Sequence, residues 1–172
     1  MTAIPRVVLF QPQIPPNTGN VARTCAATGA ELHLIEPLGF RIDDRHLRRA
    51  GLDYWPWVRL RRHQNLDTFL AGRRERGGRL IALSAHARQA YHQFHFQPDD
   101  WLLFGRESDG LPADLVAGAD ARLTIPMPLS RPAGTGGVRS LNLSVAVGVV
   151  LFEALRQGTA EGMACQNLAE GG

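Results

Sequence analysis

Residues 139–144 of this chain are Arg-Ser-Leu-Asn-Leu-Ser, between a loop rich in glycine and proline and the apolar run from Val145 to Leu151. Two other segments share this character: residues 14–20, Ile-Pro-Pro-Asn-Thr-Gly-Asn, and residues 103–107, Leu-Phe-Gly-Arg-Glu. Each places a strand end or a loop beside the start of a helix, where backbone N–H groups are free to hold a ligand. These three segments are therefore the candidates for a ligand site.

Length and composition indicate one globular domain. The chain has 172 residues, of which 44% are hydrophobic, and that is enough for a single core. We assign the domain to residues 4–157 and a frayed tail to residues 158–172. No segment resembles a signal peptide, and the longest apolar run is far shorter than the roughly 20 residues that span a bilayer. With only two cysteines, we expect no disulfide framework, a cytoplasmic location and no membrane partner.

All 19 basic side chains are arginine. Guanidinium groups suit bidentate phosphate contacts and stacking on bases better than ammonium groups do. The arginines gather locally in residues 41–49, 59–62 and 73–79. Two interpretations stay open: a surface that binds nucleic acid, or a solvated face in a chain whose composition favours arginine throughout.

Apolar periodicity predicts an α/β fold. We expect strands at residues 7–10, 32–35, 57–60, 80–84, 101–104 and 121–125, and helices at 17–28, 43–50, 66–74, 111–117 and 140–156. Asn17 is the expected N-cap of the first helix, and residues 85–97 are expected to be loop-rich. Because strands alternate with helices, the sequence predicts a single parallel sheet with helices on both faces.

The last predicted helix has almost no polar face between Ser144 and Glu153. A helix that is apolar all round must be covered all round. One side can pack on the sheet, and a second copy of the chain is the expected cover for the other, so we predict a homodimer. The small side chains of the first helix fit either a subunit contact or tight packing within one chain.

The sequence lacks the motifs of several other classes of enzyme and binding site. No G-x-G-x-x-G follows the first strand, no phosphate loop ends in Lys-Ser or Lys-Thr, and no G-x-S-x-G is present. His92 and His95 have no H-E-x-x-H or cysteine partner, so we expect no metal.

In their order and spacing, the three motifs resemble those of the SPOUT superfamily of RNA methyltransferases, over about residues 7–157. The resemblance implies a deep trefoil knot in the C-terminal part of the fold, S-adenosylmethionine as methyl donor, and tRNA as partner. The implied reaction is 2'-O-methylation of the ribose of the tRNA wobble nucleotide, a cytidine or a modified uridine. The alternatives are another tRNA or rRNA ribose, or a knotted RNA-binding protein that does not catalyse. The motifs favour catalysis, since a pure binder has no need of cofactor loops.

The resemblance also assigns roles to residues. It places Leu83, Gly105, Ile125 and Ser140 at the cofactor, and Arg23 and Arg139 at the acceptor ribose. It leaves Asn17, Glu107 and Asn142 as supporting residues. Each has a simpler alternative: Leu83 and Ile125 as strand-end core residues, Gly105 as a turn glycine, Ser140 as an N-cap.

The roles of the charged residues follow from their chemistry. Arginine is a poor general base because its pKa exceeds about 12, so Arg23 and Arg139 are expected to clamp phosphate or orient a hydroxyl. Glu107 is expected to accept backbone donors rather than to act as a base. Asp109, near the central motif, is expected to repel phosphate. The sequence names neither the general base nor the tRNA isoacceptor.

Overall fold

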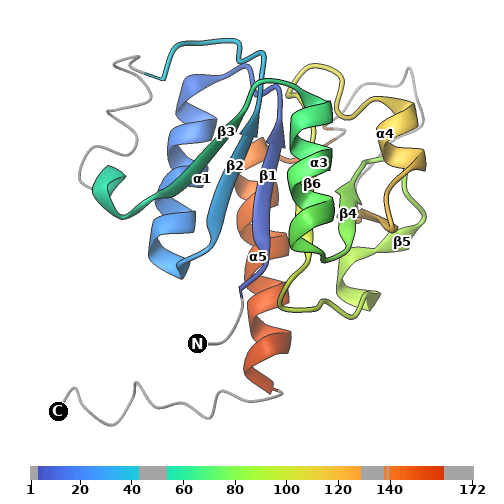
Figure 1. Ribbon diagram of the computed structural model, residues 1–172. Helices are drawn as coiled ribbons and strands as arrows, with labels where there is room; N and C mark the ends of the chain where they lie inside the picture. Colours follow the sequence, from blue (N-terminus) through green and yellow to red (C-terminus); the bar gives the residue numbers. More distant parts are fainter. Residues whose placement is uncertain (1–3, 43–53, 129–137, 139, 161–172) are drawn as a thin grey trace, which may run out of the picture.

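The computed structural model describes residues 4–42, 54–128, 138 and 140–160. Seven parallel strands form one sheet in the order β3-β2-β1-β6-β4-β7-β5 (Figure 1). The strands are β1 (Arg6–Phe10), β2 (Glu31–Ile35), β3 (Arg59–His63), β4 (Leu80–Leu83), β5 (Gln89–Ala90), β6 (Trp101–Phe104) and β7 (Ala121–Thr124). The helices are α1 (Pro15–Thr28), α3 (Leu66–Arg76), α4 (Ala113–Ala117) and α5 (Leu143–Ala160), with short 3-10 turns η1 (Trp55–Trp57) and η2 (Tyr91–Gln93). The predicted parallel α/β fold is confirmed.

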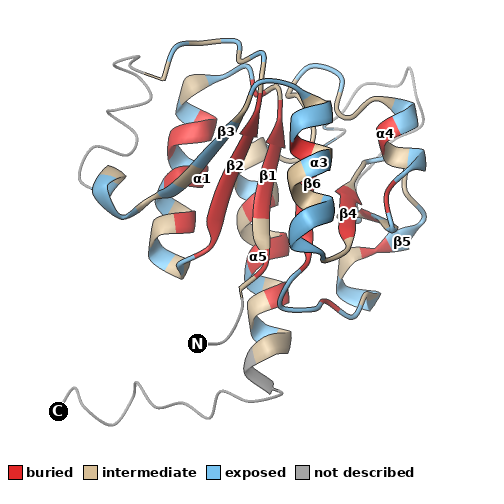
Figure 2. Ribbon diagram, viewed as in Figure 1, coloured by how far each residue is buried: buried red, intermediate tan, exposed pale blue. Residues whose placement is uncertain are grey.

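Helices cover both faces of the sheet because successive side chains in a strand point to opposite sides. Val7 and Leu9 of β1 belong to the core cluster that includes α1 and α5. Val8 and Phe10 belong to the second cluster, which includes Phe69 of α3 and the α4 region. The central strands are accordingly buried along most of their length (Figure 2), as expected for parallel strands packed on both sides.

The edge strands differ from the sequence prediction. The strand expected at residues 57–60 lies at Arg59–His63, because Trp55–Trp57 forms the 3-10 turn η1 instead. Its sequence, Arg-Leu-Arg-Arg-His, is mostly exposed, as an edge strand can be. Within the segment expected to be loop-rich, Gln89–Ala90 pairs with β7 as β5. A two-residue strand carries too little periodicity to be found from sequence.

Two helix starts also differ. α1 begins at Pro15, with prolines in its first turn and no side-chain cap, so Asn17 is not the N-cap. α5 begins at Leu143 rather than at residue 140, and it continues to Ala160, beyond the predicted end at residue 156. The Asn142 side chain accepts hydrogen bonds from the Ser144 N–H at 2.9 Å and the Ser144 hydroxyl at 2.7 Å, so Asn142 caps α5. The helix expected at residues 43–50 lies outside the described residues.

The order of the strands determines where a ligand can bind. β2 and β3 lie on one side of β1, and β6 and β4 lie on the other. Ligands of parallel sheets bind beyond the carboxyl ends of the strands, near the point where the strand order reverses. Here that point lies between β1 and β6, so the loops that follow these two strands are neighbours. Among the described helices, none has the length and apolar character needed to cross a membrane.

Candidate active site at the carboxyl ends of the strands

Three of the residues assigned to the cofactor lie together. Leu83 ends β4, Gly105 follows β6, and Ile125 follows β7. These strands are adjacent, and Leu83 is in register with Phe104 on one side and Leu123 on the other. Leu83 and Ile125 are both half-buried. They therefore present partly covered apolar surface at the strand ends, which is the kind of surface that holds an adenine ring.

Glu107 joins the loop after β6 to the loop after β1. Its carboxylate accepts the backbone N–H groups of Gln13 at 2.9 Å and Ile14 at 3.1 Å. It also accepts the side-chain amide of Asn17 at 3.2 Å. These neutral donors lie at the start of α1, where a negative charge also interacts favourably with the helix dipole. The contacts are those of a structural carboxylate.

Asn17 extends this connection to the third motif. The side chain of this buried residue donates to Glu107 and accepts the side-chain amide of Asn142 at 2.8 Å. Asn142 in turn caps α5 through Ser144. We call Glu107, Asn17, Asn142 and Ser144 the carboxyl-edge network. It links the three sequence motifs, although Asn17 and Asn142 are 125 residues apart in the chain.

Gly105 is required by its own loop. A Cβ atom at this position would lie 2.2 Å from the backbone carbon of Gly110 and 2.4 Å from the Leu111 nitrogen. The loop closes there through paired backbone hydrogen bonds between Arg106 and Gly110, and Gly110 has a φ of +75°. A side chain at this position would therefore meet the returning backbone of the loop first.

The expected repulsion between Asp109 and phosphate needs correction. The Arg106 guanidinium donates to both carboxylate oxygens of Asp109, at 2.6 and 2.7 Å. These hydrogen bonds lower the pKa of Asp109, but the adjacent positive charge compensates the negative one. Arg106 also donates to the Gln11 side chain at 2.7 Å, which ties the central loop to the end of β1.

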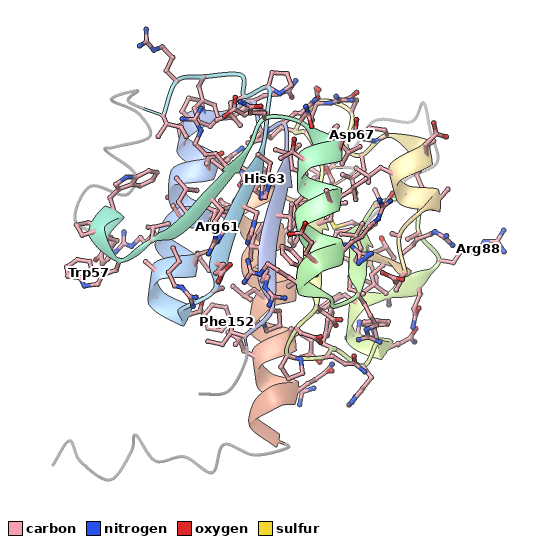
Figure 3. All side chains as sticks on the ribbon, in the orientation of Figure 1. Trp57, Arg61, His63, Asp67, Arg88 and Phe152 are labelled. Carbon is pink, nitrogen blue, oxygen red and sulfur yellow. The ribbon has the colours of Figure 1, made fainter. Side chains whose placement is uncertain are left out.

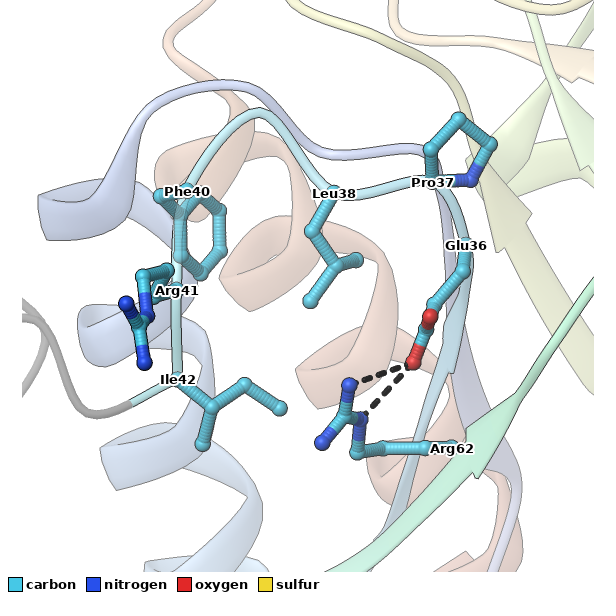
Figure 4. Close-up of a pocket in the computed structure, with 7 residues that line it drawn as sticks. All are labelled: Glu36, Pro37, Leu38, Phe40, Arg41, Ile42 and Arg62. Carbon is cyan, nitrogen blue, oxygen red and sulfur yellow. Dashed lines mark hydrogen bonds and ion pairs between the residues drawn. The ribbon is translucent and has the colours of Figure 1, made fainter.

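A cavity of about 560 Å³ lies at the same edge of the sheet, beyond β2 (Figure 4). Its lining includes Leu38, Phe40 and Ile42, and Arg62 donates to the Glu36 carboxylate across it at 2.9 Å. The Gly39 N–H donates to the carbonyl of Pro12 at 2.9 Å, so this loop is attached to the loop after β1. The cavity is separate from the strand ends that carry Leu83, Gly105 and Ile125.

The two arginines and Ser140 have different positions. Arg23 lies on the exposed side of α1, where its guanidinium stacks on the Tyr54 ring, 4.5 Å from the ring centroid, and donates to the Tyr54 hydroxyl at 3.1 Å. Ser140 is exposed just before α5. Arg139 and most of the loop between residues 127 and 138 lie outside the described residues. The structure therefore brings together the supporting residues and three of the four cofactor positions.

Comparison with known proteins agrees with this geometry. A family model for the SpoU rRNA methylase family matches residues 5–152. A tRNA (cytidine(34)-2'-O)-methyltransferase of Burkholderia ambifaria is 48% identical over 156 residues, covering 91% of this chain and 97% of the relative.

The chain belongs to the SpoU rRNA methylase family.

Solved structures of similar proteins extend this assignment. One, from work on the 2-OH methylation of C/U34 on tRNA, has a TM-score of 0.84 at 49% identity and covers 93% of this chain and 99% of its own. An AdoMet-bound rRNA methyltransferase from Sinorhizobium meliloti has a TM-score of 0.78 at 28% identity, covering 91% of this chain and 57% of its own. The resemblance inferred from the motifs is thus confirmed at the level of the family.

A second polar cluster in this family member was not predicted from sequence. At the amino ends of β2 and β3, the Glu31 carboxylate accepts hydrogen bonds from Arg59 at 2.8 Å and from Arg76 at 2.8 and 3.1 Å. It also pairs with the buried His33 at 3.1 Å, and His33 hydrogen bonds with His63 at 2.9 Å. We call these five residues the amino-edge cluster. A prediction of how β2 pairs with β3 could have indicated the cluster, because Glu31 and Arg59 lie directly opposite each other in that pairing.

The electrostatics of this cluster follow from burial and pairing. Hydrogen bonds from Arg76 hold the pKa of Glu31 at about 2. Burial lowers the pKa of His33 to about 4, against the opposing effect of Glu31. Among the described residues, no group of three or more histidine, cysteine, aspartate or glutamate side chains is arranged to hold a metal ion.

Proposed function

We propose that this protein transfers the methyl group of S-adenosylmethionine to the ribose 2'-hydroxyl of the tRNA wobble nucleotide, a cytidine or a modified uridine. The single observation that carries the proposal is the carboxyl-edge network, which joins all three motifs at one edge of the sheet. The relatives support it, because they match nearly the whole chain and are named for this reaction.

The chain offers a fitting place for the methyl donor. Leu83 and Ile125 supply half-buried apolar surface at the ends of β4 and β7, the two strands that come after β6 and its Gly105 loop in the strand order of the sheet, and the strand-end backbone supplies hydrogen-bonding groups. Ser140 completes the set, two residues before Asn142, which caps α5. When bound there, the donor supplies an electrophilic methyl group, and the protein's part is to align it with the acceptor oxygen. No metal is required by this arrangement.

The arginines are proposed to bind the nucleotide that accepts the methyl group. Their planar, permanently charged groups suit the phosphates that flank the target ribose and can also orient its hydroxyl. In this proposal Arg23 and Arg139 hold the nucleotide, while Asn17, Glu107 and Asn142 fix the loops. A deep trefoil knot formed by the C-terminal part of the chain completes the proposal on the strength of the family resemblance. A cytoplasmic location is proposed from the low cysteine content.

The proposed assembly is a homodimer. Within one chain, α5 buries Val147, Val150 and Leu151, but Val145 is 50% exposed and Phe152 is 57% exposed. An apolar side of this kind is typical of a subunit contact. Because Phe152 is exposed in the single chain, Phe152→Glu should give a folded monomer by light scattering. Thr68→Glu, at an exposed position on α3, should leave the dimer intact. A wild-type monomer at micromolar concentration would contradict this part of the proposal.

Methylation assays test the function itself. Incubation with tRNA and isotopically labelled S-adenosylmethionine should give a product that resists alkaline cleavage after the wobble nucleotide, because the free 2'-hydroxyl is gone. Label at another tRNA or rRNA ribose would support the alternative substrates. Binding of RNA without any transfer would support a non-catalytic protein. A methyl group on a base would refute the 2'-O assignment.

A substitution of Arg139 can test cofactor binding and tRNA methylation separately. Arg139→Ala should leave the affinity for S-adenosylmethionine within a few-fold, measured by calorimetry. It should lower tRNA methylation by on the order of 10²-fold, as loss of a positioned charged donor does. Arg74→Ala is the matched control, since Arg74 is exposed on α3 on the other face of the sheet. Equal losses of methylation activity in the two variants would mean that Arg139 does not act at the acceptor ribose.

A further inference from the structure

Among the described residues, Tyr54 is the one to which the Arg23 side chain makes a hydrogen bond and a cation–π contact. The guanidinium carbon lies 4.5 Å from the centroid of the Tyr54 ring, and one terminal nitrogen donates to the phenol oxygen at 3.1 Å. A guanidinium group on an aromatic face is attracted by the ring quadrupole. The two contacts together fix both the position and the plane of the group.

Tyr54 is itself held in place from the core side. The turn η1 follows it directly, and the Trp57 N–H donates to the Tyr54 carbonyl at 3.0 Å. Trp55, the next residue, is partly buried against the core cluster that includes α1 and α5. Trp57, in contrast, is 67% exposed and projects from the outer side of the turn (Figure 3). One residue of the turn thus anchors the segment while Tyr54 faces Arg23.

The arrangement leaves Arg23 available to a ligand. An arginine has five N–H donors in a rigid fork, and the Tyr54 hydroxyl accepts from one of the terminal nitrogens. Tyr54 is 37% exposed, so the pair lies at the surface rather than in a closed core. An unrestrained surface arginine loses side-chain entropy when it binds. Stacking on Tyr54 removes part of that cost before the substrate arrives.

We infer that Tyr54 is a positioning residue, which holds the Arg23 guanidinium in the plane and orientation needed to bind the target nucleotide. The inference rests on the proposed function, in which Arg23 is at the acceptor ribose. Tyr54 acts through Arg23 and needs no contact with the reacting atoms. Its contribution therefore requires the arginine to be present.

Two substitutions separate the contacts that Tyr54 makes. Tyr54→Phe keeps the ring and removes the hydroxyl, and it should lower kcat by roughly threefold to tenfold, which corresponds to the usual contribution of one hydrogen bond at a partly exposed site. Tyr54→Ala removes both contacts and should lower kcat by on the order of 30-fold. The affinity for S-adenosylmethionine should not change in either variant. Tyr91→Phe is the matched control, because Tyr91 is the only other tyrosine in the chain.

A double-mutant cycle is the decisive test. In the Arg23→Ala background, Tyr54→Ala should have no further effect on methylation, since residues that act as a unit are strongly non-additive. A loss that is the same in both backgrounds would overturn the inference, because it would mean that Tyr54 acts independently or only stabilises the fold. Thermal unfolding of each variant identifies the latter case.

The assay distinguishes this inference from the function on which it rests. If the wild-type protein forms no 2'-O-methylated tRNA, the proposed function fails. If the wild-type protein is active and the cycle is additive, only the role of Tyr54 fails. An active wild type with a fully coupled cycle supports both.

Discussion

The two edges of the sheet each contain a key glutamate, and they use it in opposite ways. At the carboxyl edge, Glu107 accepts hydrogen bonds from two backbone N–H groups and one amide, all of them neutral. At the amino edge, Glu31 is paired with arginines and a histidine. Neutral donors let Glu107 join the loops after β1 and β6 without drawing cations away from the proposed acceptor site. The arginines around Glu31 instead balance its buried charge and attach the edge strand β3 to the sheet.

The largest expected effect comes from breaking the amino-edge cluster. Glu31→Ala leaves Arg59, Arg76 and the buried His33 without their common acceptor. Removal of one partner from a buried ion pair costs about 3–5 kcal/mol, so the free energy of unfolding should fall by about 4 kcal/mol in denaturant titrations. The matched control is Glu36→Ala, whose ion pair with Arg62 is more exposed and should contribute at most about 1 kcal/mol. Similar losses would mean that burial does not distinguish the two pairs.

The second-largest expected effect comes from disrupting the loop after β6, at the carboxyl edge of the sheet. Gly105→Val places a side chain against the Gly110 backbone, so the loop must open, at a cost of about 3 kcal/mol by comparison with other overpacked sites. S-adenosylmethionine binding, measured by calorimetry, should be lost. Gly72→Val is the control, because a Cβ at Gly72 of α3 meets nothing within 4 Å. Wild-type affinity in Gly105→Val would place the cofactor elsewhere.

Acid should weaken the amino edge through the protonation of His33. The folded-state pKa of His33 is about 4, below its value of about 6.5 in an unfolded chain. The unfolded chain therefore binds the extra proton between these pH values. The resulting stabilisation is complete above pH 6.5 and is lost as the pH falls toward 4, by up to about 3 kcal/mol at about 1.4 kcal/mol per pKa unit.

His33→Gln is the control for this pH dependence, since glutamine keeps hydrogen-bonding capacity but does not titrate. Unfolding free energies measured at pH 7, 5.5 and 4.5 should show a weaker decline in the variant than in the wild type. Parallel curves for the two proteins would assign the acid sensitivity to other groups.

The smallest effect is a coupling between distant motifs. Asn17→Ala and Asn142→Ala each remove one end of the same 2.8 Å hydrogen bond. The double variant should therefore lose about 1 kcal/mol less than the sum of the single losses. Asn17→Ala combined with Asn65→Ala, which removes the cap of α3, should be additive. An additive Asn17 and Asn142 pair would show that the carboxyl-edge network does not couple its motifs.

Much of this fold follows from local sequence patterns. β1, β2, β4, β6 and β7 lie within a residue of their predicted bounds, because buried parallel strands are short apolar runs that need no partner to be recognised. The motifs around Asn17, Glu107 and Asn142 meet at the carboxyl edge of the sheet, since all three follow strands or precede helices.

The errors occurred where tertiary contacts override local preference. Asn17 has the chemistry of an N-cap, but its side chain binds Glu107 and Asn142, and two prolines begin the helix instead. Trp57 was predicted to begin a strand, but it ends the turn η1, which is accompanied by the stacking of Tyr54 on Arg23 and the packing of Trp55 on the core.

The sequence by itself determined the class of fold, the order of the elements and the family, because apolar periodicity and short motifs are local properties of the chain. Only the tertiary structure decided which polar groups meet. The bond between Asn17 and Asn142, the clash at Gly105, the Arg23–Tyr54 stack and the charge balance around Glu31 all join residues through strand register and loop geometry. Those distances are set when the sheet assembles, and no local pattern in the chain encodes them.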